Sequence, residues 1–395
     1  MKKVKTKLIA LALLAALLLP ALVGCLGTKE GNTLFRNSMV ACSYGTHYGY
    51  SDRVWANVIS PVYDYAYNFN EFNVARVKQD GKYGLINTRG IYVAEPLYDY
   101  IGAFSENGLA PFVVDGKLGY LTSNGQVIIE ARFDTEKGFF NFDPNGLCVF
   151  YEDGYYGLIN EFGQIVLDPK YDSINTSLWS MNLCGVEREG KFALYTATAL
   201  SVTGYVYDSV AYGGKDTVIV GLNGLFYYLR SDGTLLFENG FEKAWPFSAN
   251  DLALVWEDGL YGYINPDGRY ELEERFTDAR SFAPNGLALV QDGNGKYGYI
   301  NRFGDYVIQP KYLSGSDFVS DTPHSLNLAV VETPKGFGVI NASGRMIVRP
   351  TYTSLSIRVY DDDFFAGITP TGTVIFKRSG KVVKVFGQGE INLEK

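Results

Sequence analysis

The sequence is dominated by an internal repeat with a period of about 36 residues. Each copy has an aromatic residue before a glycine, two apolar residues and a polar one, a glycine-containing turn, and an apolar run leading to Pro-x-Tyr. The clearest copy is Gly295–Tyr312, GKYGYINRFGDYVIQPKY. A chance motif would not keep its register over ten copies, so the period restricts the chain to a tandem array of equivalent units. The marker glycines are Gly49, Gly84, Gly119, Gly157, Gly262, Gly298 and Gly338, with Ala193, Tyr227 and Val374 in the other three copies.

Each copy predicts three short antiparallel strands, which in the clearest copy are residues 287–290, 297–300 and 306–308. Asp-Gly or Asn-Gly separates the first two strands in most copies, as at Asp80-Gly81. These residues tolerate the positive φ of a type I′ hairpin. Because 36 residues leave no room for a crossover helix, the predicted fold class is all-β. We expect a tandem array of about ten ~36-residue antiparallel β-meander repeats, either propeller-like or open superhelical.

The marker glycine and the proline have separate expected roles. Glycine inside a strand costs about 0.5–1 kcal/mol relative to alanine, so its recurrence indicates close approach of another backbone or an aromatic ring. The proline has no N–H and is expected to end strand pairing. A Phe-containing connector then leads to the next copy. The longest connectors contain 136–145 and 314–325, so we expect any binding surface on the connector side of the array.

The copies without glycine are the fifth, sixth and tenth. Because degenerate units are expected at the ends of arrays, they suggest two halves meeting near residue 210, although one uninterrupted superhelix fits the pattern as well. The predicted organisation is a signal peptide (1–24), a lipidated cysteine and tether (25–43), the first half of the repeats (44–210), the second half (211–385) and a C-terminal tail (386–395).

The N-terminus carries four lysines followed by an apolar run, Leu8–Val23, that is short for a membrane span. It ends in Leu-Val-Gly-Cys25, which resembles the lipobox of bacterial lipoproteins. The resemblance implies lipidation of Cys25 and an extracytoplasmic protein held on a bacterial membrane by its acyl chains. The alternative is an ordinary secretory signal with a chance cysteine. Cleavage before Cys25 would change the net charge from −8 to −12.

The repeat resembles the WG (or KWG) repeat family of bacterial proteins over residues 48–380. The family tryptophan is replaced by another residue in every copy, usually by Tyr or Phe. The resemblance implies a packing role for the aromatic-glycine pair and no single biochemical activity. The expected repeat-packing residues are Tyr83, Gly84, Tyr156, Gly157, Tyr261, Gly262, Tyr297, Gly298, Phe337 and Gly338.

Few residues suggest catalysis or metal binding. The chain has only two histidines, His47 and His324, which is weak support for a metal site or a Ser-His-Asp triad. Cys148 and Cys184 occupy the same repeat position and are expected to be small buried residues. The run Asp361–Asp363 lacks the alternating spacing of a calcium loop. We therefore expect no catalytic site, metal or cofactor, and the negative net charge argues against nucleic acid.

The leading functional hypothesis is a surface-anchored module that binds protein or glycan, or acts as a scaffold, at the cell envelope, and that is not an enzyme. The alternative is an envelope carbohydrate hydrolase that uses paired carboxylates from the connectors. Trp179, Trp245 and the connector tyrosines are candidates for stacking on sugars, although burial in the repeat explains them as well. A third hypothesis, a purely structural spacer, predicts no cluster of exposed aromatic side chains.

Overall fold

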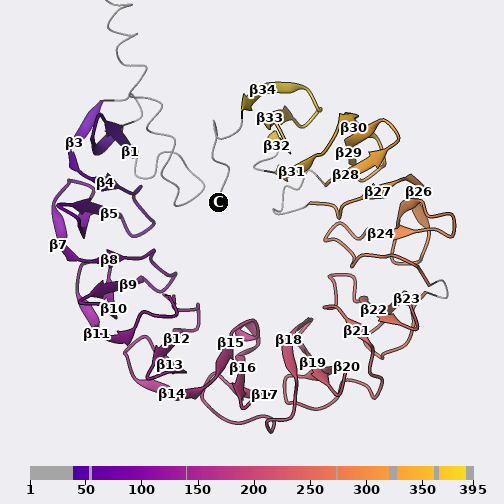
Figure 1. Ribbon diagram of the computed structural model, residues 1–395, viewed down its shortest axis with the longest axis horizontal. Coiled ribbons are helices and arrows are strands. Elements are labelled where there is room, and N and C mark those ends of the chain that lie inside the picture. The colour runs from indigo at the N-terminus through magenta and orange to yellow at the C-terminus, as the bar shows by residue number, and fades with distance from the viewer. Residues whose placement is uncertain are drawn as a thin grey trace, which may run out of the picture. The chain divides into compact units, whose positions relative to one another are not determined.

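Figure 1 shows the computed structural model, which describes residues 39–52, 56–138, 140–272, 275–319, 327–359 and 364–387. Within these ranges the strands form ten separate antiparallel sheets, each of three or four strands in meander order. The predicted all-β class and β-meander repeat are therefore confirmed. The described residues contain one short 3-10 helix, η2 (Trp179–Met181), and hence no helix long and apolar enough to cross a membrane.

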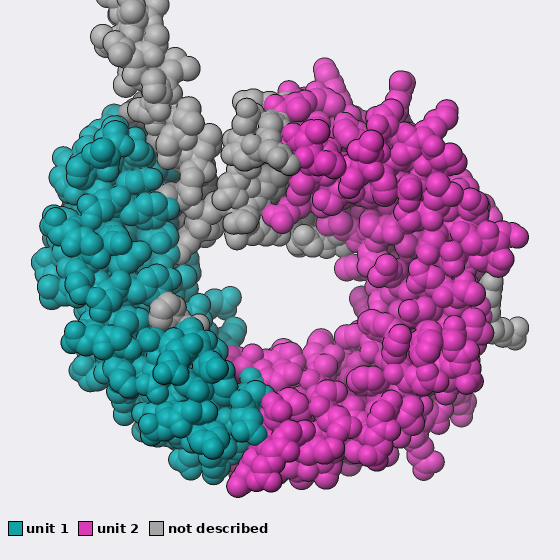
Figure 2. Space-filling model, in the orientation of Figure 1, with its two compact units in different colours: residues 1–174, 393–395 teal, residues 175–392 magenta. Residues whose placement is uncertain are grey.

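The chain divides into two compact units (Figure 2), residues 1–174 with 393–395 and residues 175–392. The described strands of unit 1 are β1 (Met39–Tyr44), β2 (His47–Asp52) and β3 (Asn57–Tyr63); β4 (Tyr65–Ala66), β5 (Val74–Gln79), β6 (Lys82–Asn87) and β7 (Tyr92–Tyr98); β8 (Tyr100–Ile101), β9 (Leu109–Val114), β10 (Lys117–Thr122) and β11 (Val127–Asp134); β12 (Leu147–Glu152), β13 (Tyr155–Asn160) and β14 (Ile165–Tyr171).

Unit 2 repeats the same plan. Its sheets are β15 (Ser173–Asn175, which begins in unit 1), β16 (Leu183–Arg188) and β17 (Lys191–Thr196); β18 (Ser209–Gly214), β19 (Thr217–Leu222) and β20 (Leu225–Arg230); β21 (Lys243–Ala244), β22 (Ala253–Glu257) and β23 (Leu260–Ile264); β24 (Ala288–Gln291), β25 (Tyr297–Ile300) and β26 (Tyr306–Tyr312); β27 (Ser314–Gly315), β28 (Leu328–Thr333), β29 (Gly336–Asn341) and β30 (Met346–Tyr352); β31 (Ser356–Val359), β32 (Phe364–Thr369), β33 (Gly372–Lys377) and β34 (Val382–Gly387).

Two boundaries differ from the expected ones. The division into units falls before residue 210, because Val210 packs into one core with Leu194 of the fifth sheet and Val218 of the sixth. The first sheet begins at Met39, inside the segment expected to be a tether. Residues 39–42 are apolar and pair in antiparallel register with residues 49–52 of β2, so they form a buried first strand.

In several repeats the first hairpin has the predicted backbone conformation. Asp80 and Gly81 have φ values of 50° and 80°, as a type I′ turn requires at its two central positions. Both residues of the turn have positive φ at Asp115-Gly116, Asp153-Gly154, Asn223-Gly224 and Asp258-Gly259 as well.

The marker glycine allows the third strand to bulge toward the second. In the clearest repeat, Tyr297 pairs with Tyr312 and Tyr299 pairs with Ile308, so Gly298 alone faces three residues of β26. A Cβ on Gly298 would lie 2.6 Å from the carbonyl oxygen of Ile308 and 2.8 Å from the nitrogen of Pro310. The glycine was expected to allow close approach of a backbone or of an aromatic ring, and both occur. A Cβ on Gly157 would also lie 2.5 Å from the Phe150 ring.

The prediction that proline ends the third strand is wrong. Pro310 lies within β26, and pairing resumes at Tyr312 beyond it. The bulge explains the difference, because a residue at a bulge is released from the ladder and needs no N–H donor. Proline therefore marks the bulge and not the end of the strand.

A second glycine of the repeat, in the turn before the third strand, packs against the preceding repeat. A Cβ on Gly163 would lie 3.1 Å from Ile129 in unit 1, and a Cβ on Gly344 would lie 3.2 Å from Ile308 in unit 2. Each glycine also has positive φ, 75° and 77° respectively. These turns therefore require glycine for backbone conformation and for close contact between neighbouring repeats.

A buried tyrosine joins each of five repeats to the connector that follows it. In the clearest case, the Tyr299 hydroxyl donates a 2.8 Å hydrogen bond to the carbonyl of Ser316, and its ring centroid lies 4.8 Å from that of Phe318. We call this arrangement a tyrosine clasp. The five clasp tyrosines are fully buried and, with their carbonyl and ring partners, are Tyr50 (Tyr67, Phe69), Tyr120 (Phe140, Phe142), Tyr228 (Trp245, Phe247), Tyr263 (Arg280, Phe282) and Tyr299 (Ser316, Phe318).

Aspartates near the end of the third strand link neighbouring repeats by polar contacts. Asp134 accepts a 2.6 Å hydrogen bond from Lys117 of its own repeat and a 3.2 Å bond from the backbone N–H of Asp153 in the next hairpin. The Lys117 ammonium is the main reason why the pKa of Asp134 lies below its ordinary value. Asp99 and Asp208 make the equivalent contacts, with Lys82 and Asp115 and with Lys191 and Asn223.

Candidate functional site

Most of the chemically active residues considered from the sequence are not brought together. Cys148 and Cys184 are free and buried, and burial raises the pKa of each thiol to about 12, so they are inert core residues as expected. His47 lies in β2. Cys25, His324 and Asp361–Asp363 lie outside the described residues. The described part of the chain has no group of three or more His, Cys, Asp or Glu placed to hold a metal ion.

The expected repeat-packing residues fall into two classes. The glycines are buried beside the third strand, whereas the aromatic residues before them are only partly buried. Tyr297, for example, donates a 2.6 Å hydrogen bond to Asp278. The larger contribution to the core comes from the residue after the marker position, which in five repeats is a clasp tyrosine.

In unit 1, partly exposed tyrosines form one connected cluster across the first three sheets. The Tyr48 and Tyr65 ring centroids lie 4.9 Å apart, those of Tyr65 and Tyr67 5.0 Å, and those of Tyr83 and Tyr100 5.5 Å. Besides burial, Tyr83 also helps to raise the pKa of Tyr67, so the two groups are close enough to interact. We call these five residues the tyrosine surface.

The register of the second sheet places these residues in a row. Tyr65 on β4 is opposite Lys78 on β5, which is opposite Tyr83 on β6. Directly opposed residues point to the same face of a sheet. Tyr48 comes from the sheet before and Tyr100 from the sheet after, so the surface crosses the boundaries between neighbouring repeats.

Two basic side chains belong to this cluster. The Arg76 guanidinium lies 3.9 Å from the Tyr67 ring centroid, and its Nη1 donates a 2.9 Å hydrogen bond to the carbonyl of Ile101. Arg76 is 5% exposed, and burial lowers its pKa. Lys78 is more accessible, with its Nζ 5.4 Å from the Tyr83 ring centroid. The tyrosine surface therefore combines aromatic faces, hydroxyl groups and positive charge.

The clasp holds this surface in place. The Tyr50 hydroxyl donates a 2.7 Å hydrogen bond to the carbonyl of Tyr67, and the Tyr67 N–H donates to the carbonyl of Arg76 at 2.9 Å. Burial raises the pKa of both Tyr65 and Tyr67, so their hydroxyls stay protonated at neutral pH. The backbone that carries Tyr67 is thus held in place before any ligand arrives, which lowers the entropic cost of binding.

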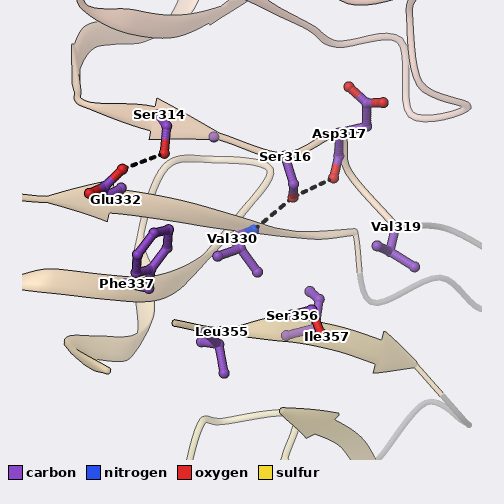
Figure 3. Close-up of a pocket in the computed structure, with 11 residues that line it drawn as sticks. Ser314, Ser316, Asp317, Val319, Val330, Glu332, Phe337, Leu355, Ser356 and Ile357 are labelled. Carbon is purple, nitrogen blue, oxygen red and sulfur yellow. Dashed lines mark hydrogen bonds between the residues drawn. The ribbon is translucent and has the colours of Figure 1, made fainter. Parts of the chain in front are cut away.

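Unit 2 contains a cavity of about 430 Å³ beside the connector that the sequence marked as long (Figure 3). Ser314 donates a 2.7 Å hydrogen bond to Glu332, and the Val330 N–H donates to Ser316 Oγ at 3.0 Å. Phe337, Leu355 and Ile357 supply apolar lining. In Figure 3 the Asp317 and Glu332 carboxylates point in different directions, so they do not face one another across the cavity.

These features define a β-repeat protein in which partly exposed tyrosine rings contact one another across the first three sheets of unit 1. Five segments match the family model described as WG containing repeat, at residues 48–83, 83–117, 156–192, 261–297 and 297–322. The matches support the family resemblance in both units. No curated protein matches the chain.

Solved structures give only distant likenesses. A eukaryotic initiation factor has a TM-score of 0.46 and 12% identity, over 80% of this chain and 96% of that one. The extracellular domain of a one-component system from B. thetaiotaomicron has a TM-score of 0.30 and 11% identity, over 89% of this chain and 65% of that one. Both TM-scores are below 0.5, so neither likeness supports a statement about ligand or location.

Sequence reasoning identified Tyr48 and Tyr83 as members of the repeat pattern but did not single out Tyr65, Tyr67 or Tyr100. The available sequence signal was that the connectors of unit 1 contain more tyrosines than the repeat pattern requires. The equivalent connector positions of the eighth repeat hold Ser314 and Ser316, whereas the first repeat has tyrosine at both Tyr65 and Tyr67.

Proposed function

We propose that this protein is an extracytoplasmic, lipid-anchored binding module that holds an acidic glycan on its tyrosine surface. The observation that carries the proposal is the contact of five partly exposed tyrosine rings across three sheets, with Arg76 and Lys78 among them. Anchoring through Cys25 is part of the proposal and rests on the lipobox-like sequence.

A glycan suits this surface better than a protein partner does. Each ring of the tyrosine surface has an apolar face and a hydroxyl at its edge, and sugars likewise present apolar C–H faces bordered by hydroxyls. The accessible Lys78 favours carboxylate groups on the ligand, and the buried Arg76 adds positive charge beneath the rings.

Hydrolysis has no comparable support. A glycosidase needs two carboxyl groups on either side of the scissile bond. The Asp317 and Glu332 side chains diverge at the cavity of unit 2, and the tyrosine surface has no acidic member. Burial raises the pKa of Asp317, but a single such acid does not make a catalytic pair.

The test is calorimetric titration of the full-length protein in detergent with two soluble hexasaccharides, acidic hyaluronan and neutral chitin. We expect hyaluronan binding to weaken by about tenfold or more when Tyr65 and Tyr67 are both changed to Ala, because about 1.4 kcal/mol corresponds to tenfold. Tyr155→Ala is the matched control, since Tyr155 lies in the same unit and is 46% exposed outside the cluster.

The test is completed by capturing envelope proteins with the unaltered chain and with the Tyr65/Tyr67 alanine variant. The unaltered chain could fail to bind hyaluronan and yet capture a specific protein that the Tyr65/Tyr67 variant does not capture. That result would replace the glycan proposal with a protein-binding one. An unaltered chain that binds neither would overturn the binding function itself.

A further inference from the structure

Unit 2 carries a second aromatic and basic cluster in the seventh sheet. Its members are Lys243 on β21, Trp245 just after it, Trp256 on β22 and Tyr261 on β23. Lys243 is exposed and the three aromatic side chains are partly exposed. We call these four residues the tryptophan surface.

The contacts within the tryptophan surface are direct. Lys243 Nζ lies 4.4 Å from the Trp256 ring centroid, and the Trp245 and Tyr261 ring centroids are 5.8 Å apart. Lys243 is opposite Trp256, which is opposite Tyr261, so the three share one face of the sheet.

This geometry reproduces that of the second sheet in unit 1. There Tyr65 is opposite Lys78, which is opposite Tyr83. Trp245 replaces Tyr67, and its N–H donates to the carbonyl of Leu254 at 3.0 Å as that of Tyr67 donates to Arg76 at 2.9 Å. A clasp tyrosine, Tyr228, holds the carbonyl of Trp245 at 2.7 Å. The lysine and one aromatic residue have exchanged strands, and Leu254 stands in the place of Arg76, but both sheets combine one lysine with three aromatic rings.

The repeat itself does not impose this set. At the same positions of the ninth sheet are Ser314, Glu332 and Phe337, which supply an acid in place of the lysine. In the fourth sheet Lys137 Nζ also lies over an aromatic ring, 5.7 Å from the Tyr151 centroid, but Tyr151 is only 9% exposed and offers little open face. Among the described repeats, the open combination of a lysine with Tyr or Trp at these positions thus recurs once in each unit.

We infer that the tryptophan surface is a second binding site for an acidic glycan. The inference rests on the proposed function and deepens it, because the chain then holds two segments of a polymer. Indole rings present larger faces for sugar stacking than phenol rings, and each keeps a polar N–H at its edge. In a chain of net charge −8, a lysine placed against these rings favours a carboxylate-bearing ligand. Two sites on one chain raise the avidity for a repetitive polymer.

The test uses the full-length protein in detergent and the hyaluronan hexasaccharide. We expect two hexasaccharides to bind per chain, and one to bind when Trp245 and Trp256 are both changed to Ala. The Tyr65/Tyr67 alanine variant should also bind one, and the combined variant none. Trp179→Ala is the control for loss of a tryptophan elsewhere in unit 2, and circular dichroism checks that each variant is folded.

A less disruptive substitution tests the same site if the double tryptophan change disturbs folding. Lys243→Gln removes the charge of an exposed side chain and leaves the rings in place. We expect it to weaken the second hyaluronan site by about tenfold, to reduce its salt dependence, and to leave binding of chitin hexasaccharide unchanged.

The outcomes separate the inference from the proposed function. One hexasaccharide per chain, lost only in the tyrosine variant, overturns the second site and leaves the proposed function standing. Two sites with equal affinity for the neutral chitin oligomer overturn the acidic preference. No hyaluronan binding by the unaltered chain overturns both.

Discussion

The Tyr299 hydroxyl donates a hydrogen bond to the carbonyl of Ser316, seventeen residues further along the chain. The same offset separates Tyr50 from Tyr67, Tyr228 from Trp245, and Tyr263 from Arg280. Two of these carbonyls belong to residues of the proposed binding surfaces. The core of one repeat therefore fixes the position of side chains that the next connector presents.

Changing Tyr299 to Phe should destabilise the eighth repeat by about 1–3 kcal/mol, because the Ser316 carbonyl loses its donor. Urea unfolding measures the change in the free energy of unfolding, and hydrogen exchange shows whether the loss centres on 314–319. Tyr155→Phe is the control, since its hydroxyl lies on an exposed side chain. Equal stability of the Tyr299 and Tyr155 variants would contradict the clasp.

Changing Gly298 to Ala should destabilise the protein by about 1–3 kcal/mol, because the added methyl meets backbone atoms of Ile308 and Pro310 that cannot rotate away. Gly293 of the same repeat is the matched control. A Cβ there would meet nothing within 4 Å, and Gly293 does not have positive φ. Urea midpoints that shift equally for the two variants would refute the steric role of Gly298.

Acid should weaken the contacts between repeats. Contacts with Lys117 and Lys191 hold the pKa values of Asp134 and Asp208 below the ordinary 3.8 in the folded protein. Their stabilising effect is therefore fully present above pH ~4 and is lost as pH falls through the lowered folded pKa values. Urea unfolding at pH 7 and pH 3 measures the effect. Asp134→Asn should reduce the difference between the two pH values, and an unchanged difference would contradict this assignment.

Alkaline solution should also destabilise the fold, through the clasp tyrosines. Burial raises the phenol pKa of Tyr263 and Tyr299 above the ordinary 10.0. The unfolded chain ionises first as pH rises beyond about 10, so stability falls above that pH. Absorbance of tyrosinate should show accessible tyrosines titrating near their ordinary pKa and a second group that ionises only as the circular dichroism of the fold is lost. A single titration without unfolding would contradict the buried group.

The sequence predicted the features that depend on short distances along the chain. Asp80-Gly81 indicated a hairpin because its φ requirement is local, and Gly298 indicated a close approach because glycine is otherwise unfavourable in a strand. The role of Pro310 was misjudged because a missing donor fits both a strand end and a bulge. Only the register of Tyr297 with Tyr312 distinguishes the two.

The candidate site was harder to predict, since it forms between repeats. Tyr48, Tyr65 and Tyr100 belong to three different sheets, and their contacts depend on how neighbouring sheets pack. The clasp was missed for a related reason. Tyr299 follows the marker glycine and reads as an ordinary strand residue until its partner at Ser316 is known. The surplus of tyrosine in the connectors was the one sequence signal that pointed to the site.

The contact between Gly344 and Ile308 of the preceding repeat has a consequence for how such a chain changes length. The turn glycine always touches the repeat before it, and the clasp always touches the connector after it. Duplicating one whole period that contains a clasp therefore supplies the donor, the acceptor and the glycine of the new contacts together. Loss of a whole period removes them together. Whole repeats are thus the natural unit of insertion and deletion, whereas a partial repeat leaves one partner of each contact behind.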